Sequence, residues 1–463
     1  MKRIASCRSA LLAAAVSDSI PRNASLPATL CTAVVLAAAG LGIASNAGAS
    51  TYFVTTAGDP GGGGTQSLRQ AVALAQVSAG NIVAFDAALN GSTITLQQGQ
   101  IKITKSMQIQ GPGSSRLTIS GQHNSRIFLV YNTAPNTTVQ VDLDFISLTQ
   151  GSTTGCGGAV YAIGLPDLPG GPAETSVFTY DLGLSGNSAQ NGGALCFIGA
   201  NGLVAHSRVT GNHGDLAGGA IYSAPADYLA VTESTLSGNS AGYQGGAIFF
   251  KNATLSVATS TISGNTIPAP SGAGDQGGGG IAIANASNTH IVNSTITANF
   301  AFAGGAGIRL FDGPSANTAN IEFATIAGNV GHAFETGNGI VASGGSATIF
   351  SSIVANNSSS GAGYDDMKGT FTANNTLIRS VGSAIVTGSS NKVGLDPQLS
   401  LLADHGGPTL TLLPAIGSPV IDSAGVPAPS LDQRSFGRSS PDMGAVERQY
   451  PENIVFRDGF DST

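Results

Sequence analysis

The sequence predicts an all-β chain wound into a parallel β-helix, with successive coils stacked on one another. A short apolar and hydroxyl-bearing run, closed by a small residue and Asn, occurs seven times between residues 181 and 356. A phrase of two or three small residues before an aliphatic one, such as the Gly-Gly-Ala-Ile of 218–221, interleaves with it. Repetition at a period near 26 residues is the signature of a solenoid.

The composition agrees with a folded β-solenoid. The chain has 463 residues, of which 65 are Gly, 41% are hydrophobic and 10% are charged. The hydrophobic content and the fixed positions of Gly argue against disorder. Thr, Ser, Val and Ile fill the runs between the Gly pairs and favour strands. A leucine-rich repeat is disfavoured because Leu is sparse and no repeat has a helical period.

The first 49 residues have the composition of an extended secretory signal. Lys2 and Arg3 begin a basic region, residues 30–43 are apolar, and Ala47 and Ala49 are small residues suited to cleavage before Ser50. A membrane anchor is the alternative, but the apolar run is short for a bilayer, and no later segment has the ~20 apolar residues of a membrane span. The sequence therefore predicts export to the cell surface or the extracellular space.

The charge of the remaining chain limits its partners. Residues 50–463 carry 15 basic and 25 acidic side chains. This acidic balance argues against nucleic acid or an anionic membrane as the partner.

Residues 50–94 are expected to form a strand at 51–55 and a cap for the solenoid. Ser67 and Gln70 make a capping box for a helix that places Leu68, Ala71 and Val72 on one face. A one-sided helix suits the open end of a solenoid, whose strand edges need cover. Further short strands are expected at 81–85, 92–96, 100–103, 107–109, 117–120 and 127–130, and the coils are expected to span residues 95–395.

The closing Asn of each repeat is predicted to be structural. An Asn at the same turn of every coil can hydrogen-bond to the Asn of the coils above and below. The candidates for this ladder are Asn187, Asn212, Asn239, Asn265, Asn299, Asn329 and Asn356.

Two cysteines, Cys156 and Cys196, remain after removal of the signal. Export would permit a disulfide between them. The repeat register argues against it, because Cys156 precedes its Gly pair whereas Cys196 follows its own by three residues. That offset is about 16 Å along an extended strand, beyond disulfide reach unless a loop breaks the register.

Two groups of residues could carry chemistry. Asp142 and Asp144 alternate on one strand face, about 7 Å apart, and could bind Ca²⁺ or act as an acid/base pair; the alternative is a solvated outer face. Asp181, His206 and Glu233 each stand six residues before a ladder Asn, so they are expected to stack ~5 Å apart. They could do acid/base work or hold a metal, but the sequence favours a turn position that tolerates polar residues.

Several segments resemble bacterial secreted β-helix proteins with polymorphic outer-membrane-protein repeats, a group that shares the pectate-lyase-like right-handed fold. Residues 65–72 (Thr-Gln-Ser-Leu-Arg-Gln-Ala-Val) are similar to a Cys-Ser-Leu-Arg-Glu-Ala-Ile signature, with Gln66 in place of Cys. Residues 396–411, 417–422, 431–434 and 442–447 resemble a choice-of-anchor Q domain. The resemblance implies an exported right-handed β-helix with no agreed reaction, a C-terminal domain at 396–447 and a tail at 448–463 that could be a sorting signal.

The sequence favours a non-enzymatic surface or secreted protein, adhesin-like or carbohydrate-binding, because long repeated faces present extended binding surfaces. The alternative is a polysaccharide lyase or glycoside hydrolase. The expected partner is a polysaccharide or a host or cell-surface ligand. No metal set and no cofactor other than Ca²⁺ is indicated, and the sequence leaves the oligomeric state open.

Overall fold

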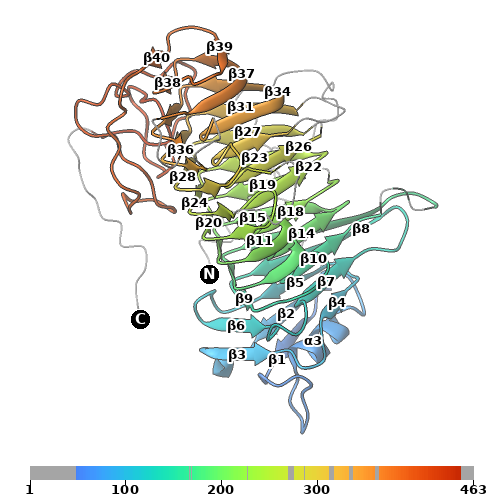
Figure 1. Cartoon of the computed structure of the whole chain (residues 1–463). Helices are drawn as coiled ribbons and strands as arrows, with labels where there is room; N and C mark the ends of the chain where they lie inside the picture. Colours follow the sequence, from blue (N-terminus) through green and yellow to red (C-terminus); the bar gives the residue numbers. More distant parts are fainter. Residues whose placement is uncertain are drawn as a thin grey trace.

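The computed structural model describes residues 48–449 except 166, 168, 227, 269–275, 286, 312–316, 333–336 and 360–363. Within this range the chain winds into a tall parallel β-helix, as the repeats predict (Figure 1). The predicted signal and the predicted tail lie outside the described residues, apart from 48–49 and 448–449. No helix in the described part of the chain is long and apolar enough to cross a membrane.

Three sheets run along the solenoid, with 21, 12 and 7 strands, and the coils between residues 188 and 359 contribute to all three. The largest sheet holds two series of strands. The first series is β4 (Ile101–Ile103), β7 (Phe128–Tyr131), β10 (Val160–Ile163), β14 (Leu195–Ile198), β18 (Ile221–Ser223), β22 (Ile248–Lys251), β26 (Ile281–Ala284) and β30 (Ile308–Leu310). The second series is β1 (Thr51–Val54), β2 (Asn81–Phe85), β5 (Met107–Gln110), β8 (Thr137–Asp144), β11 (Ala173–Tyr180), β15 (Asn201–Ala205), β19 (Tyr228–Thr232), β23 (Thr254–Ala258), β27 (Asn288–Val292), β31 (Asn317–Glu322) and β39 (Ile385–Thr387). Two longer strands, β34 (Ile340–Phe350) and β37 (Met367–Asn374), belong to both series.

The other two sheets complete each coil. The 12-stranded sheet contains β3 (Ser92–Thr95), β6 (Leu117–Ser120), β9 (Ser147–Thr149), β12 (Gly183–Ser185), β16 (Arg208–Thr210), β20 (Thr235–Ser237), β24 (Thr261–Ser263), β28 (Thr295–Thr297), β32 (Thr325–Ala327), β35 (Ile353–Ala355), β38 (Leu377–Ile378) and β40 (Lys392–Val393). The 7-stranded sheet contains β13 (Ser188–Asn191), β17 (His213–Ala217), β21 (Ser240–Ala241), β25 (Thr266–Ile267), β29 (Phe300–Ala301), β33 (Val330–Gly331) and β36 (Ser358–Ser359).

Aliphatic columns fill the interior of the solenoid. Strands that follow one another in the 12-stranded sheet pair in parallel and in register, so side chains one repeat apart lie over each other. Burial of each such side chain stabilises the fold by about 1.5–3 kcal/mol. One fully buried column consists of Val209, Leu236, Ile262, Ile296 and Ile326.

The Gly pairs turn the chain from the 7-stranded sheet into the first series. Gly218 has φ 66°, and a Cβ there would lie 2.3 Å from the carbonyl oxygen of Ile221. Gly219 packs against the next coil, where a Cβ would lie 2.1 Å from the carbonyl oxygen of Gly246. Because one Gly needs a left-handed conformation and the other a backbone-to-backbone contact, the pair recurs from coil to coil.

The Asn side chains form a buried hydrogen-bonded ladder. Asn239 Nδ2 donates to Asn265 Oδ1 at 2.9 Å, and the backbone N–H of Asn239 donates to the same oxygen at 3.0 Å. Equivalent bonds join Asn187, Asn212, Asn239, Asn265, Asn299, Asn329 and Asn357 in sequence.

The assignment of Asn356 to the ladder is wrong. Val354, and not Ile353, pairs with Ile326 of the preceding coil, so the ladder position falls on Asn357. Asn356 instead adopts φ 61° at the position that Gly328 occupies one coil earlier. The resemblance of residues 353–356 to the repeat phrase is therefore out of register by one residue.

An aspartate ends the ladder. Oδ1 of Asp366 accepts the backbone N–H of Asn357 at 2.9 Å and its Nδ2 at 2.7 Å, while Oδ2 accepts the N–H of Ser380 at 2.8 Å. Both oxygens accept N–H donors, and an Asn, with one acceptor and one donor, could not make all three bonds. Burial raises the pKa of Asp366 to about 6, although these bonds act in the opposite direction.

This carboxyl group gives stability a pH dependence. Because the pKa of Asp366 is higher in the folded state than in the unfolded chain, its stabilising contribution is complete below about pH 4 and is lost as the pH rises through about 6. We expect the urea midpoint of the wild type to fall between these values relative to that of Asp366→Asn. Equal pH profiles for the two proteins would contradict the assignment.

Cys156 and Cys196 form a disulfide, with a Cα–Cα distance of 5.6 Å, so the expectation that the register keeps them apart is wrong. Cys196 pairs with Tyr161 in the sheet, five residues after Cys156. The left-handed turn at Gly157, with φ 66°, folds the chain back over this strand, so five residues no longer correspond to an extended 16 Å.

Loss of this disulfide should destabilise the protein without changing its fold. The two cysteines are 40 residues apart in sequence, and a bridge of that span stabilises by about 2–4 kcal/mol. We expect the double variant Cys156→Ala, Cys196→Ala to have a lower urea midpoint, and reducing agent to lower the wild-type midpoint while leaving the variant unaffected. Insensitivity of the wild type to reductant in a protein shown to be oxidised would contradict this expectation.

The predicted helix is present as α3 (Leu68–Ala75) and packs on the first coil (Figure 1). Ser67 accepts the N–H of Gln70, and the Gln70 side chain accepts the N–H of Ser67, which completes the predicted capping box. Its buried face joins the main core through Leu68 and Val72. A short 3₁₀ helix, η2 (Ala87–Leu89), follows β2.

Residues 396–449, here called the C-terminal segment, fold back along the 12-stranded sheet instead of extending the solenoid (Figure 1). Gln433 is fully buried in this contact. Its Nε2 donates to Thr261 Oγ1 at 2.9 Å, and its Oε1 accepts Thr295 Oγ1 at 2.6 Å. The N–H of Ala445 also donates to Thr325 Oγ1 at 3.0 Å. The segment therefore covers the outer side of β24, β28 and β32.

Candidate functional site

The column of Asp181, His206 and Glu233 lies where the second series turns into the 12-stranded sheet. The three residues have φ values of 50°, 48° and 48°. The same position has positive φ in later coils, at Thr259, Asn293, Phe323, Ser351 and Asn375. Because unlike side chains share this backbone conformation in successive coils, the turn itself fixes the position, which supports the structural interpretation.

A second ladder, of serine, explains why this turn is polar. The backbone N–H of Ser207 donates to Ser234 Oγ at 3.0 Å, and that of Ser234 donates to Ser260 Oγ at 3.2 Å. Ser294 continues the ladder, and Ser352 fills the same position further along. Each of these residues immediately follows the left-handed position, and together they bind the backbone N–H groups that the turn exposes. We did not anticipate this ladder, although its signal, a Ser five residues before a ladder Asn, is present in the sequence.

Two members of the column are in contact. His206 Nε2 pairs with Glu233 Oε2, and the Tyr180 ring lies 4.8 Å from the His206 ring. Asp181 instead accepts a hydrogen bond from Ser114 Oγ at 2.8 Å. His206 and Glu233 are 41% and 32% exposed, so a ligand could reach them. An imidazole held by a carboxylate could act as a general base.

The two aspartates of β8 differ in burial. Asp142 is half-buried and accepts Gln140 Nε2 at 2.9 Å, whereas Asp144 is only 4% exposed and accepts Gln108 Nε2 at 2.6 Å. A solvated outer face is therefore wrong for Asp144, whose neighbours across the sheet include the larger side chain of Tyr180. Ca²⁺ takes six to eight oxygen ligands. The described residues contain no group of three or more His, Cys, Asp or Glu suited to a metal.

Two further histidines lie near an acidic or an aromatic side chain. His213 Nε2 is 3.4 Å from Asp215 Oδ1 on the exposed side of β17. The centre of the His332 ring lies 4.3 Å from that of Phe302, and Glu335, three residues later in the sequence, lies outside the described residues.

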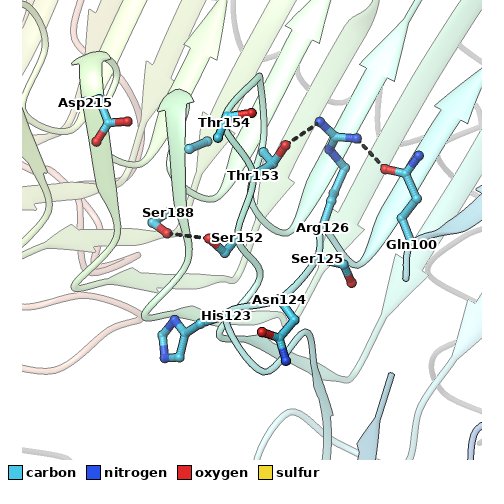
Figure 2. Close-up of a pocket in the computed structure, with 11 residues that line it drawn as sticks. Gln100, His123, Asn124, Ser125, Arg126, Ser152, Thr153, Thr154, Ser188 and Asp215 are labelled. Atoms are coloured by element: carbon cyan, nitrogen blue, oxygen red, sulfur yellow. Dashed lines mark hydrogen bonds between the residues drawn. The ribbon is translucent and has the colours of Figure 1, made fainter. Parts of the chain in front are cut away.

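A polar cleft of about 580 Å³ opens at one edge of the 7-stranded sheet (Figure 2). The loop of residues 121–126 and the loop of residues 152–154 form two of its walls, and β13 and β17 contribute Ser188 and Asp215. Gln122 and His123 in the first loop both have positive φ, 54° and 56°. The residues that follow them, from 123 to 126, line the cleft. The sequence pattern does not indicate this cleft, because its walls come mainly from turns and not from repeated positions.

Arg126 forms one end of the cleft. Its Nη2 donates to the carbonyl oxygen of Cys156 at 2.8 Å and to Thr153 Oγ1 at 3.3 Å, and its Nη1 donates to Gln100 Oε1. The guanidinium also lies 5.1 Å from the centre of the Tyr161 ring. Burial lowers the pKa of Arg126, and nearby Tyr161 opposes that shift.

The outer side of the second series carries a long surface that changes character along the solenoid. Over β27, β31, β34 and β37 it presents two adjacent rows of polar side chains, here called the polar face. The polar face consists of Asn288, His290, Thr318, Asn320, Ser346, Thr348, Thr370 and Thr372, all half-buried or exposed. Towards β11 the outer side carries an apolar cluster, here called the apolar patch: Phe178 and Tyr228, which are partly exposed, and Leu203, Ala205 and Ala230, which are buried beside them.

Ionisable groups on this surface are shifted by partial burial. The pKa of His290 on β27 is lowered, and the pKa of Glu322 on β31 is raised, in both cases because burial disfavours the charged form. Glu322 lies beside Val292 and Phe350 in the sheet, which accounts for its apolar surroundings. Both shifts favour the neutral form of the side chain, at His290 within the polar face and at Glu322 beside it.

Comparison with known proteins gives one structural similarity. The fold is similar to the crystal structure of pectate lyase Pel9A, with a TM-score of 0.46 and 16% sequence identity, over 88% of this chain and 98% of that one. No family model matches the sequence, and no curated protein matches it.

The site residues proposed from sequence are thus brought together only in part. His206 contacts Glu233, whereas Asp181 accepts a hydrogen bond from Ser114. Asp142 and Asp144 each accept a hydrogen bond from a glutamine side chain. The polar face and the Arg126 cleft are the two further surfaces that the structure reveals.

Proposed function

We propose that the protein is an exported, non-enzymatic β-helix that binds a polysaccharide along the outer side of the second series. The observation that carries this proposal is the polar face, in which hydroxyl and amide groups repeat in two rows from coil to coil. Neighbouring coils are ~4.8 Å apart, so a chain lying along the axis meets the same kinds of groups again and again. Hydroxyl and amide groups can both donate to and accept from sugar hydroxyls.

The apolar patch supports the same ligand class. Sugar rings have C–H faces as well as hydroxyl edges, and the partly exposed ring of Phe178 offers an apolar contact to them. An extended glycan could thus contact apolar groups over β11–β19 and polar groups over β27–β37. Extended surfaces of this kind are typical of solenoids that bind long partners.

Export is part of the proposal and has two supports. Residues 1–49 have the composition of a secretory signal, and the Cys156–Cys196 bridge suits an oxidising compartment. The adhesin-like role and attachment at the cell surface, including any anchor after residue 447, extend this proposal and rest on the sequence resemblance.

Substitution on the polar face tests the binding proposal. Thr348 is exposed in the middle of this surface, and Thr348→Leu should weaken retention on an immobilised polysaccharide by about tenfold, the effect of losing about 1.4 kcal/mol of contact free energy. Thr235→Leu, on the 12-stranded sheet, is the matched control and should bind as the wild type does. Affinity electrophoresis against a polysaccharide panel provides the measurement, and equal retention of both variants on every retained polysaccharide would overturn the proposal.

The polysaccharide-cleaving alternative has its own observation, the contact of His206 with Glu233 beside Tyr180. Incubation of the wild type with the same panel, followed by an assay for new chain ends, separates the two functions. The proposed function predicts retention without new ends. New ends that disappear in His206→Ala and in Glu233→Gln would instead establish the enzyme.

A further inference from the structure

We infer that the cleft at Arg126 is a second binding site, separate from the polar face, that takes a short neutral saccharide. The cleft lies at the edge of the 7-stranded sheet and shares no residue with the second series (Figure 2). This inference goes beyond the binding of a polysaccharide along the solenoid and does not depend on it.

The size of the cleft suits a small ligand. A cavity of about 580 Å³ falls within the range of about 300–1,000 Å³ typical of small-molecule sites. Its walls come from two loops and two strands, so a ligand would be held from several sides. Two restraints fix the wall that carries Thr153 and Thr154. Cys156, two residues after Thr154, is held by the disulfide, and Arg126 donates to Thr153 Oγ1 and to the Cys156 carbonyl oxygen.

The lining favours a ligand with many hydroxyl groups. Ser152 and Ser188 face each other with 3.2 Å between their Oγ atoms, and Thr153 and Thr154 continue the same wall. Ser125 Oγ is buried and has no hydrogen-bond partner in the protein. The exposed hydroxyls of this wall can each donate to and accept from a sugar hydroxyl.

The charges favour a neutral ligand over an ion. Arg126 and Asp215 lie at opposite ends of the cleft in Figure 2, with the serine pair between them. The hydrogen-bond partners of Arg126 are two carbonyl oxygens, an amide and a hydroxyl, all uncharged, so its positive charge favours an acceptor atom. Asp215, about two-thirds exposed, favours a donor. A sugar supplies both the acceptor and the donor, because each hydroxyl can donate and accept. An anion would be repelled by Asp215, and a cation would be repelled by Arg126.

Binding can be measured by titrating the full chain with neutral methyl hexosides and their disaccharides, with ligand-observed NMR as the readout. Ser125→Leu fills the cleft and should weaken the binding of a recognised sugar by about tenfold or more. Asp215→Asn keeps a polar group at the far end and should retain most of the affinity. Ser237→Leu, on the 12-stranded sheet, is the matched control and should bind as the wild type does.

The outcomes separate this site from the polar face. Loss of small-sugar binding in Ser125→Leu, with polysaccharide retention and urea midpoint unchanged, supports a second site. If Thr348→Leu abolishes small-sugar binding and Ser125→Leu does not, the sugar binds on the polar face and the inference is overturned. Failure of every neutral sugar to bind, or binding of charged sugars alone, also overturns it.

Discussion

Replacement of Asn265 by alanine is expected to lower the free energy of unfolding by about 3–5 kcal/mol. The side chain is fully buried and makes four hydrogen bonds to neighbouring coils. Its loss would leave the backbone N–H of Asn239 without a partner and would remove one of the two hydrogen bonds of Asn239 Nδ2, which keeps its bond to the carbonyl oxygen of Val209. The carbonyl oxygen of Leu236 would also lose a donor. Each buried polar group left unsatisfied costs about 1–3 kcal/mol, and some relaxation of the turn would reduce the sum. Urea unfolding followed by circular dichroism provides the measurement.

The matched control is Asn288→Ala, an Asn of the same chain that is exposed on the polar face. A surface change of this kind is expected to stay within about 0.5 kcal/mol of the wild type. Similar destabilisation by the two substitutions would contradict the ladder as a main source of stability. A further contrast lies within one coil, because Asn357→Ala removes a ladder member whereas Asn356→Gly, which suits the left-handed turn, does not.

The repeated positions of the fold could be predicted from sequence because each has a local physical cause. Gly218 and Gly219 are required by a left-handed turn and by a close backbone contact. Ser67 and Gln70 satisfy each other's backbone N–H groups at the start of α3. A contact that depends only on the turn, or on the neighbouring coils, requires the same residue type in every coil. It therefore appears in the sequence as a residue that recurs with the period of the repeat.

The misassignment of Asn356 has a cause outside the repeat. Ile353 resembles the inward Ile of the repeat phrase, but it packs outward against Val420 and Met443 of the C-terminal segment. Because the C-terminal segment covers Ile353, an outward position of this strand is apolar and resembles an inward one. A shift of one residue in register exchanges the two faces of a strand, so the sequence pattern assigns the wrong face here. The contact joins residues far apart in the chain, which a repeat pattern does not encode.

The candidate sites were harder to predict for the same reason. The pairing of His206 with Glu233 follows from the coil period, whereas the Arg126 cleft needs the shape of the loop at 121–126. The disulfide likewise depends on the turn at Gly157. The repeat period predicts which residues stack in one column. Contacts between different columns depend on the backbone path of the turns, which the period does not give.

The second large effect is expected at Arg438, where the C-terminal segment meets the solenoid. Its Nη1 lies 3.4 Å from Glu447 Oε2, and the two side chains are 1% and 3% exposed. The guanidinium also donates to Asn293 Oδ1 at 3.1 Å and lies over the Phe323 ring at 4.8 Å. Arg438→Met would leave Glu447 buried without its cation, and loss of one partner of a buried pair costs about 3–5 kcal/mol.

This cost should appear first in the attachment of the C-terminal segment. Because Asn293 and Phe323 belong to the solenoid, Arg438→Met is expected to expose residues 396–449 to limited proteolysis and faster hydrogen exchange before the coils unfold. Arg208→Met, which removes an exposed arginine of β16, is the matched control and should leave the segment protected.

A double-mutant cycle separates the loss of the pair from the loss of packing. Glu447→Gln removes the buried negative charge, so the combined variant Arg438→Met, Glu447→Gln should be less destabilised than the sum of the two single changes. If the two effects simply add, the pair contributes nothing specific. Attachment of the segment would then rest on Gln433, whose amide bridges Thr261 and Thr295 whether or not the ion pair is present.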